Sequence, residues 1–394
     1  MKSQFARISV FIALFLIVLI SAQCNKKNEK VEDVLSISNN QPAKPSLRVE
    51  FTEVMSISDA DWIDYGSIFI DEQKNIIYWS GRERTVGIFD SDGSLLFKKK
   101  FNIGKGFGDI NFFDFDDYAG KYYVFDKSNR RVNIFNKEFS IQEAHDLRQE
   151  YGKDRFIMRI GKQGDLFFLY ESQTVAGGKI NKEYGIANYG VNGKKRKIEY
   201  LNKKAVAFSS TQSEKMIAHS FVQPLLRYAI SADGNIWVCD RWQYKIYCYL
   251  PDGTLTKVIE KEHKKLELKG ELIEKFKKRH KIEDTEDSPF NTLLPEYVYP
   301  IEDFVLIDNK YIIVIRADYM LLDDKQDRMK ADLFSFEGKF LNEFEIPKYY
   351  LTYEFSNQFK SNICYKNGHI YTLEADEDLE NFYIKKYRLK ILEN

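Results

Sequence analysis

The sequence predicts an all-β protein: a six-bladed β-propeller of four-stranded antiparallel blades, with a short helical insertion between blades 4 and 5. A unit of four apolar strands recurs six times along the 394 residues, and many of its turns contain an Asp-Gly or Asn-Gly step. Aromatic residues make up 15% of the chain, with 30 Phe and 25 Tyr. Sheets that stack face to face around an axis are apolar on both faces, which accounts for this aromatic content.

The first repeat unit shows how the strands are recognised. Gly66–Ile70 and Asn75–Trp79 are apolar runs separated by a tight polar turn. Thr85–Asp90 follows, and Ser91-Asp92-Gly93 turns into Leu95–Phe97, with glycine where a hairpin needs positive φ. The second strands of the other units are Lys121–Asp126, Asp165–Leu169, Asn235–Asp240, Tyr311–Ile315 and His369–Leu373.

One strand precedes the first full unit. Arg48–Val54 is expected to supply the missing outer strand of the last blade and so to close the ring. Six whole units plus a spare strand favour six blades over a seven-bladed ring or a pair of β-sandwiches. The propeller domain is therefore expected to span residues 47–394.

The connection between units 4 and 5, about residues 261–300, is long enough to hold a separate element. Four apolar residues recur in it at helical spacing and predict an amphipathic helix over Glu271–Lys281. The apolar side of this helix is expected to cover the mouth of the propeller. The four residues are Leu268, Leu272, Ile273 and Phe276.

The N-terminus predicts export. Lys2 and Arg7 form a short basic region, and the apolar run Ile8–Ile20 follows it. As a helix this run is only about 20 Å long, so it is short for a single membrane anchor, which is the alternative. Residues 1–23 are therefore interpreted as a signal peptide.

Cys24 follows the small residues Ser21 and Ala22 and opens a polar segment. This start is similar to that of a bacterial lipoprotein, in which the cysteine is lipidated. The similarity implies a membrane anchor at Cys24 in the bacterial cell envelope, facing the periplasm or the cell surface. Residues 24–46 are expected to be a flexible tether between the anchor and the folded domain.

Two stretches, Asn75–Gly93 and Asn235–Gly253, carry a family resemblance. Their second strands, charged loops and third strands resemble NHL-type propeller repeats. Gly104–Asp109 is similar to the Gly-rich link between such blades. The layout resembles that of exported bacterial six-bladed β-propeller lipoproteins. No activity is carried over from NHL enzymes, because units 3, 5 and 6 depart from the pattern.

Composition and charge exclude some functions. The 59 Lys and Arg balance the 59 Asp and Glu, so nothing favours nucleic-acid binding. Gly104–Asp109 matches no phosphate-binding fingerprint, because strand rather than helix follows it. Ser209, Ser210 and Ser213 have no nucleophile elbow. We expect no catalytic residue, although a metal-dependent, lactonase-like hydrolase or lyase with an axial site remains the alternative.

A metal or other cofactor is not expected. Propeller enzymes that resemble lactonases hold an axial metal with His, Glu, Asp or Asn from several blades. Of the five histidines, only His219 falls where a ligand is plausible. Calcium is the remaining possibility, because four aspartates lie near the strands expected to line the axis. They are Asp114, Asp116, Asp117 and Asp303.

The predicted binding surface is one face of the ring, where the loops between second and third strands and the links between blades emerge. Arginine beside aromatic residues suits anionic or planar ligands through bidentate hydrogen bonds and stacking. We expect a protein or a small anionic ligand to bind there, and a solvated rim is the alternative. The candidate residues are Arg82, Arg84, Arg130, Arg241, Trp242 and Arg316.

Cys239 and Cys248 lie on consecutive strands of one blade. An exported protein could oxidise them to a disulfide. The hairpin register places them diagonally, so two buried free thiols are favoured.

Overall fold

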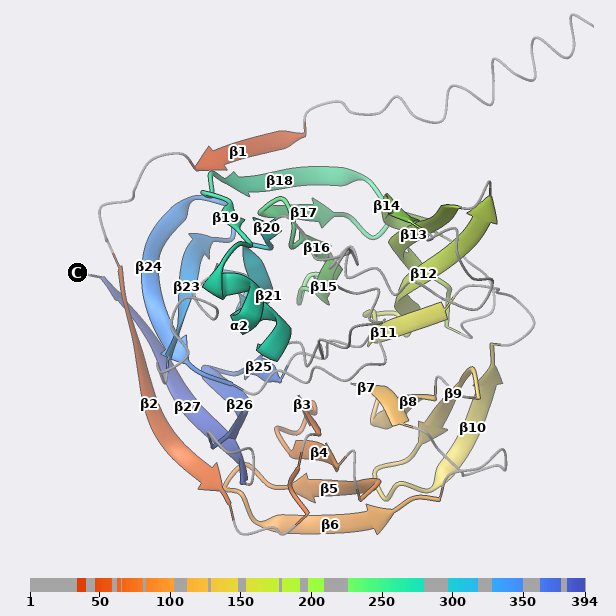
Figure 1. Cartoon of the computed structure of the whole chain (residues 1–394). Coiled ribbons are helices and arrows are strands. Elements are labelled where there is room, and N and C mark those ends of the chain that lie inside the picture. The colour runs from red at the N-terminus through yellow and green to blue at the C-terminus, as the bar shows by residue number, and fades with distance from the viewer. Residues whose placement is uncertain are drawn as a thin grey trace, which may run out of the picture.

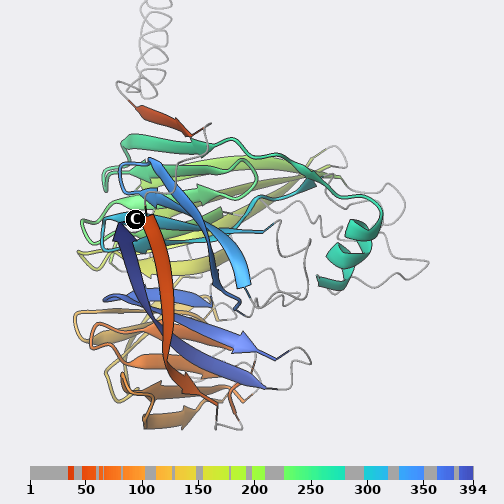
Figure 2. The same ribbon diagram turned by 90° about the vertical axis from the view of Figure 1, so that its left-hand side faces the viewer.

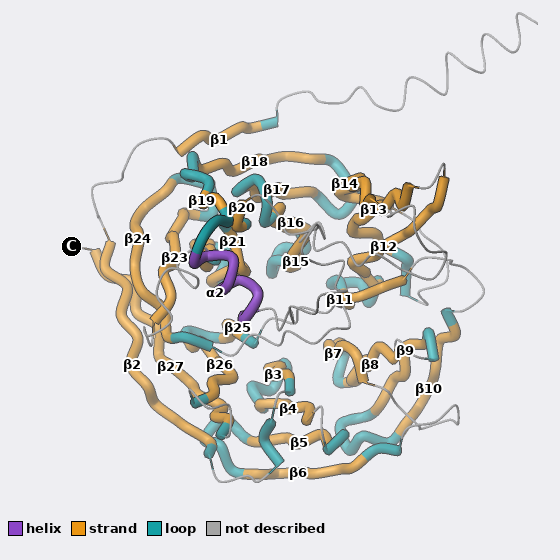
Figure 3. The backbone as a smooth tube through the Cα atoms, in the orientation of Figure 1, coloured by secondary structure: helices purple, strands orange, loops and turns teal. Residues whose placement is uncertain are grey.

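The computed structural model forms a ring of six four-stranded antiparallel sheets around one axis (Figure 1), as the sequence predicts. In blades 1 to 5 the four strands of the blade follow one another in sequence from the axis to the rim. Figure 3 shows that nearly all regular structure is strand. The structure describes residues 34–39, 47–58, 62–64, 66–80, 83–102, 112–126, 129–147, 154–176, 179–191, 198–208, 226–279, 297–317, 328–349, 362–376 and 381–393.

The first three blades are regular sheets. Blade 1 contains β3 (Ser67–Ile70), β4 (Ile76–Ser80), β5 (Thr85–Phe89) and β6 (Leu95–Lys100). Blade 2 contains β7 (Phe112–Tyr118), β8 (Lys121–Asp126), β9 (Arg131–Phe135) and β10 (Ile141–Asp146). Blade 3 contains β11 (Asp154–Ile160), β12 (Leu166–Ala176), β13 (Lys179–Asn188) and β14 (Ile198–Phe208).

The last three blades include the insertion and the closure. Blade 4 contains β15 (Leu226–Ile230), β16 (Ile236–Asp240), β17 (Lys245–Tyr249) and β18 (Leu255–Lys261). Blade 5 contains β21 (Ile301–Ile307), β22 (Tyr311–Arg316), β23 (Arg328–Ser335) and β24 (Phe340–Pro347). Blade 6 contains β25 (Ile363–Lys366), β26 (His369–Ala375), β27 (Phe382–Glu393) and β2 (Leu47–Ile57).

The ring closes through β2, as expected from Arg48–Val54. This N-terminal strand pairs antiparallel with the C-terminal strand β27, from Leu47 opposite Glu393 to Ile57 opposite Ile384. Strands β2 and β27, from opposite ends of the propeller, therefore lie side by side in one sheet (Figure 2). Phe51 of β2 also stacks on Phe344 of blade 5, with ring centroids 6.0 Å apart.

One strand was not expected. Within the segment interpreted as a flexible tether, β1 (Leu35–Asn39) pairs parallel with β18, the outer strand of blade 4. The Asn39 amide donates to the carbonyl oxygens of Glu260 and Gly338 and accepts from the Phe340 N–H. The flexible interpretation is therefore wrong for Leu35–Asn39, because an outer strand offers unpaired backbone groups that a short segment can bind.

The predicted hairpin turns form for the reason expected. In blade 1, Gly93 has φ of 91°, and the Asp90 carboxylate accepts hydrogen bonds from the backbone N–H groups of Asp92 and Ser94. Gly253 adopts the same φ in the corresponding turn of blade 4. These turns join third and fourth strands, so in blades 1 and 4 the Asp-Gly step determines where the blade folds back.

Aromatic side chains fill the seams between blades. Phe69 of blade 1 contacts Phe115 of blade 2, with ring centroids 4.8 Å apart. Phe125 of blade 2 meets Phe168 of blade 3 edge to face at 5.2 Å. Buried apolar clusters occupy all six seams around the ring, and one of these clusters extends through blades 2, 3 and 4. The high Phe and Tyr content is thus explained by blade packing.

The helical insertion is α2 (Glu271–Arg279), close to the predicted bounds. Figure 2 shows it projecting from one face of the ring. On its apolar side, Phe276 packs against Leu268 and Val298, beside the two-stranded sheet of β19 (Leu266–Glu267) and β20 (Tyr297–Val298). The insertion therefore buries its own apolar face. Coverage of the mouth by this helix stays a prediction.

No helix in the described part of the chain is long and apolar enough to cross a membrane.

Candidate functional site

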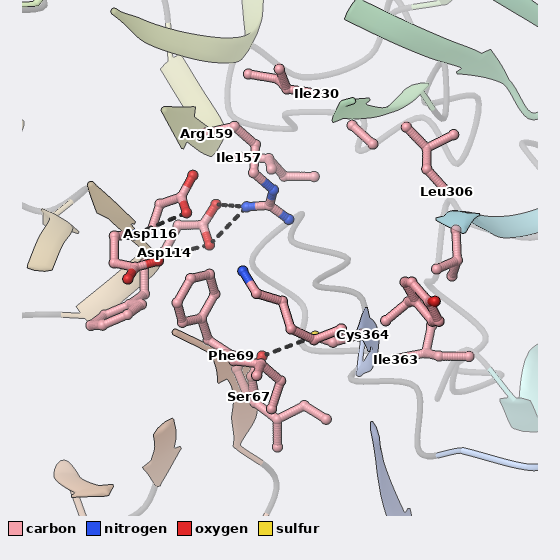
Figure 4. Close-up of a pocket in the computed structure, with 18 of the residues that line it drawn as sticks. Ser67, Phe69, Asp114, Asp116, Ile157, Arg159, Ile230, Leu306, Ile363 and Cys364 are labelled. Atoms are coloured by element: carbon pink, nitrogen blue, oxygen red, sulfur yellow. Dashed lines mark hydrogen bonds and ion pairs between the residues drawn. The ribbon is translucent and has the colours of Figure 1, made fainter. Parts of the chain in front are cut away.

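The candidate site is a cavity of about 400 Å³ on the propeller axis. Its lining comes from the innermost strand of every blade: β3, β7, β11, β15, β21 and β25. These six strands have a neighbour on one side only, so their other backbone edge faces the cavity. Figure 4 shows charged, aromatic and aliphatic side chains from different blades converging on it.

The Asp114 carboxylate joins two of these inner strands. Its Oδ2 accepts a hydrogen bond from the backbone N–H of Met158 at 2.6 Å and lies 3.2 Å from Nη1 of Arg159 (Figure 4). Asp114 belongs to blade 2 and Arg159 to blade 3. The side chain thus supplies the acceptor that a neighbouring strand would otherwise provide.

Asp116, two residues further along β7, also accepts a backbone hydrogen bond from β11. Its Oδ2 accepts from the backbone N–H of Ile160 at 2.7 Å, and its Oδ1 accepts from the Asp117 N–H. Burial raises the pKa of this carboxyl group to about 7, and the nearby Arg159 guanidinium opposes that rise. The group therefore changes charge near neutral pH.

The other lining carboxylates also have partners. Asp117 accepts from the backbone N–H of Glu72 and lies 3.4 Å from the ammonium of Lys137; burial raises its pKa. Asp303 accepts from the Phe304 N–H and lies 3.8 Å from Nε of Arg227, whose pKa is lowered by burial. All four aspartates that the sequence placed near the axis do line the cavity.

Lys366, at the end of β25, is the third lining cation. Within the described residues, no carboxylate lies within ion-pair distance of its ammonium group. Its neighbour Cys364 also lines the cavity, and its Sγ is 3.7 Å from the carbonyl oxygen of Ile68. Burial raises the pKa of the Cys364 thiol to about 12, so this thiol is protonated at physiological pH.

Two predicted docking residues lie on the surface. Arg84 and Arg130 are exposed in the loops before the third strands of blades 1 and 2, and both have positive φ. Arg82 and the lipidation residue Cys24 lie outside the described residues. Docking through Arg84 and Arg130 stays a prediction.

The other docking candidates are engaged inside the chain. Arg241 is fully buried: its Nη2 is 3.0 Å from Oε1 of Glu302, and its guanidinium lies over the Tyr299 ring at 4.3 Å. Trp242 packs edge-on against Tyr299. Arg316, also buried, donates to Glu343 at 3.1 Å. The pairing and stacking chemistry expected of these residues is present, but it acts within and between blades 4 and 5.

The metal and cysteine predictions can be checked in part. Within the described ranges, no three His, Cys, Asp or Glu side chains could hold a metal ion together. His219 and His280 lie outside those ranges. Cys239 and Cys248 are buried free thiols, as favoured, and their strands place Cys248 opposite Trp237 rather than opposite Cys239.

Three lining cations were missed at the sequence level: Arg159, Arg227 and Lys366. Each lies in the first strand of its repeat, where the corresponding positions of blade 1 are mostly apolar. A charged residue in that innermost strand is the signal that could have identified them.

Comparisons with known proteins support the fold. No protein-family model matches the chain, and no curated protein matches it in sequence. A candidate exported protein of Bacteroides fragilis aligns with a TM-score of 0.52 and 11% identity, over 91% of this chain and 99% of that chain. A virginiamycin B lyase of Staphylococcus aureus aligns with a TM-score of 0.42 and 11% identity, over 87% and 100%. A gluconolactonase of Xanthomonas campestris gives 0.42 and 9%, over 86% and 90%.

These similarities concern architecture. At such identities the first alignment shows a shared fold alone, and the two enzymes, with TM-scores below 0.5, carry no argument about function. The chain is a six-bladed β-propeller. The resemblance to NHL-type repeats stays a prediction.

Proposed function

We propose that the protein is an exported, membrane-tethered binding propeller that holds a small ligand in its axial cavity and leaves it chemically unchanged. The cavity carries the proposal. Its volume of about 400 Å³ lies in the range of small-molecule sites, and its wall combines aromatic and aliphatic side chains with a few charged groups.

The hydrogen bonds made by the lining carboxylates favour binding of a ligand over its chemical conversion. The carboxylates of Asp114 and Asp116 accept backbone N–H groups of the neighbouring blade, and Asp303 accepts one from its own strand. A carboxylate that already satisfies a backbone donor has a structural role, and its displacement would leave that donor unpaired. These carboxylates are therefore held in place by the backbone and can line a binding cavity without taking part in a reaction.

Export and tethering rest on the N-terminal sequence. Residues 1–23 have the layout of a signal peptide, and Cys24 opens the polar segment that follows. The Bacteroides fragilis protein of the same fold is described as a candidate exported protein, which agrees with this proposal. A tethered propeller would present both faces of its ring to solutes.

A lipid anchor predicts a clear change on substitution of Cys24. The full-length chain expressed in a Gram-negative host should partition into the detergent phase of a Triton X-114 extraction, because an acyl chain provides about 0.8 kcal/mol per buried CH₂ group. Cys24→Ser should move it to the aqueous phase. Cys239→Ser, which changes a buried thiol, serves as the control. Equal partitioning of the Cys24→Ser and unmodified chains would reject the anchor.

Binding in the cavity can be tested with N-phenyl-1-naphthylamine, an uncharged aromatic probe that fluoresces in apolar surroundings. We expect saturable fluorescence with the purified protein. Leu306→Trp, and separately Ile230→Trp, enlarge side chains that line the cavity (Figure 4), and each should weaken binding by about tenfold or more.

The matched control for this test is Leu96→Trp. Leu96 is 58% exposed on β6 at the rim of blade 1, so this variant adds an indole ring far from the axis. It should bind the probe as the unmodified protein does, and thermal unfolding would show that each variant is folded. Unchanged binding by both folded cavity variants would refute the proposal. Lactone hydrolysis that is lost in Asp116→Asn would support the alternative hydrolase instead.

A further inference from the structure

Among the described residues, Lys366 differs from the other cations that line the cavity in its lack of a nearby counter-ion. The other two lining cations face carboxylates that also line the cavity: Arg159 faces Asp114 at 3.2 Å and Arg227 faces Asp303 at 3.8 Å. Lys366 is partly buried and has no such counter-ion among the described residues. A partly desolvated ammonium group without a counter-ion favours an incoming anion.

The apolar part of the cavity wall determines which kind of molecule can carry the anionic group. Phe69 and Phe115 lie against each other at 4.8 Å, and Ile230 and Leu306 line the cavity from blades 4 and 5. These side chains offer an apolar surface to a ligand that is small enough for the axis. A ligand that satisfies both parts of the wall has one anionic group and an apolar, planar or aliphatic body.

We infer that the axial cavity binds a small monocarboxylic acid, whose carboxylate pairs with Lys366 and whose apolar body lies against the aromatic and aliphatic wall. This inference rests on the proposed binding function and specifies its ligand class. The aspartates of β7 then control the affinity through pH.

Asp116 is the titrating group. It faces the Arg159 guanidinium from β11, the Tyr228 phenol from β15, and the neighbouring carboxylates Asp114 and Asp117 on its own strand. Its pKa of about 7 means that it is mostly neutral at pH 6 and mostly ionised at pH 8. An ionised Asp116 repels a carboxylate in the same cavity, so binding should weaken as pH rises through 7.

The test compares 4-phenylbutyrate with its uncharged amide, 4-phenylbutyramide, by isothermal titration calorimetry. The acid should bind at least about tenfold more tightly than the amide at pH 6, since a charge-assisted pair forms only with the acid. Lys366→Met should remove that difference and leave amide binding unchanged. Lys310→Met, an exposed lysine on the neighbouring hairpin of blade 5, should change neither.

The pH profile gives an independent readout. Acid affinity should fall about three- to tenfold between pH 6 and pH 8, because the ligand stays ionised while Asp116 gains its charge. In Asp116→Asn the affinity should no longer depend on pH, since an amide does not ionise; its single oxygen can still accept from the Ile160 N–H, while the hydrogen bond from the Asp117 N–H is lost.

Two results would overturn the inference: equal affinity for the acid and the amide, or acid binding that is unaffected by Lys366→Met. These results can be told apart from a failure of the proposed function, because the naphthylamine probe carries no carboxylate and tests binding in the cavity by itself. Binding of that probe together with equal binding of acid and amide would retain the binding propeller and reject the carboxylic acid.

Discussion

Replacing Arg241 with methionine is expected to lower the free energy of unfolding by about 3 to 5 kcal/mol. The guanidinium group is fully buried, pairs with Glu302, donates from Nε to the carbonyl oxygen of Ile301, and stacks on Tyr299. Methionine fills much of the volume but leaves the Glu302 carboxylate, itself 1% exposed, without its cation. Urea unfolding followed by tryptophan fluorescence measures the change.

The double variant Arg241→Met/Glu302→Met provides the control for this prediction. It removes both charges together, so most of the lost stability should return, because the large cost of the single change comes from a buried carboxylate left without its cation. Arg84→Met, on the corresponding exposed loop of blade 1, should change stability by less than about 0.5 kcal/mol. A loss below about 1 kcal/mol in Arg241→Met would show that the buried pair contributes little.

This result bears on tests of docking at the face that carries the arginine loops. Loss of a partner on substitution of Arg241 or Arg316 would report disturbed packing of blades 4 and 5 as readily as a lost contact, since both side chains are engaged inside the protein. Arg84 and Arg130 are exposed and can be replaced without that ambiguity.

Removing the closing strand is expected to have the second large effect. A variant that lacks residues 1–58 loses β2, the whole outer strand of blade 6, together with β1 at the edge of blade 4. The long strand β27 then has an open edge, and the stacking of Phe51 on Phe344 is lost. We expect the midpoint of thermal unfolding to fall by about 10 °C or more, measured by circular dichroism.

Adding the missing strand as a separate peptide shows whether the lost stability comes from the open ring or from another effect of the truncation. A synthetic peptide of residues 47–58 should restore much of the lost stability at saturating concentration, by binding to the native state alone. The same peptide with Phe51→Asp should restore less. If the shortened chain unfolds at the same temperature as the complete chain, β2 does not hold the ring closed.

The repeat pattern was sufficient to predict the six blades. Strand alternation and Asp-Gly turns depend on neighbours in sequence, so they predict each blade from local residues alone, as at Gly93 and Gly253. Counting the strands predicted that Arg48–Val54 closes the ring, since a last blade with three strands of its own needs a fourth. The strand β1 could not be predicted in this way, because only the folded edge of blade 4 offers it a partner.

The candidate site was predicted less well. The four aspartates were placed near the axis because they lie in or beside first strands, and they do line the cavity. Arg241 and Arg316 were assigned to a binding surface on one face of the ring because loop positions usually face solvent, yet both are buried. Their partners Glu302 and Glu343 lie on blade 5, and a distance along the chain of 27 to 61 residues hides such pairs from local reasoning.

The sequence by itself determined the number of blades, the order of their strands, the strand that closes the ring and the helix of the insertion, because each depends on periodicity and turn chemistry within a short segment. Only the tertiary structure decided which charges remain available. Whether Lys366, Arg159 or Arg241 can meet a ligand depends on which carboxylate of another blade lies within about 4 Å, and that distance exists only after the blades have stacked around the axis.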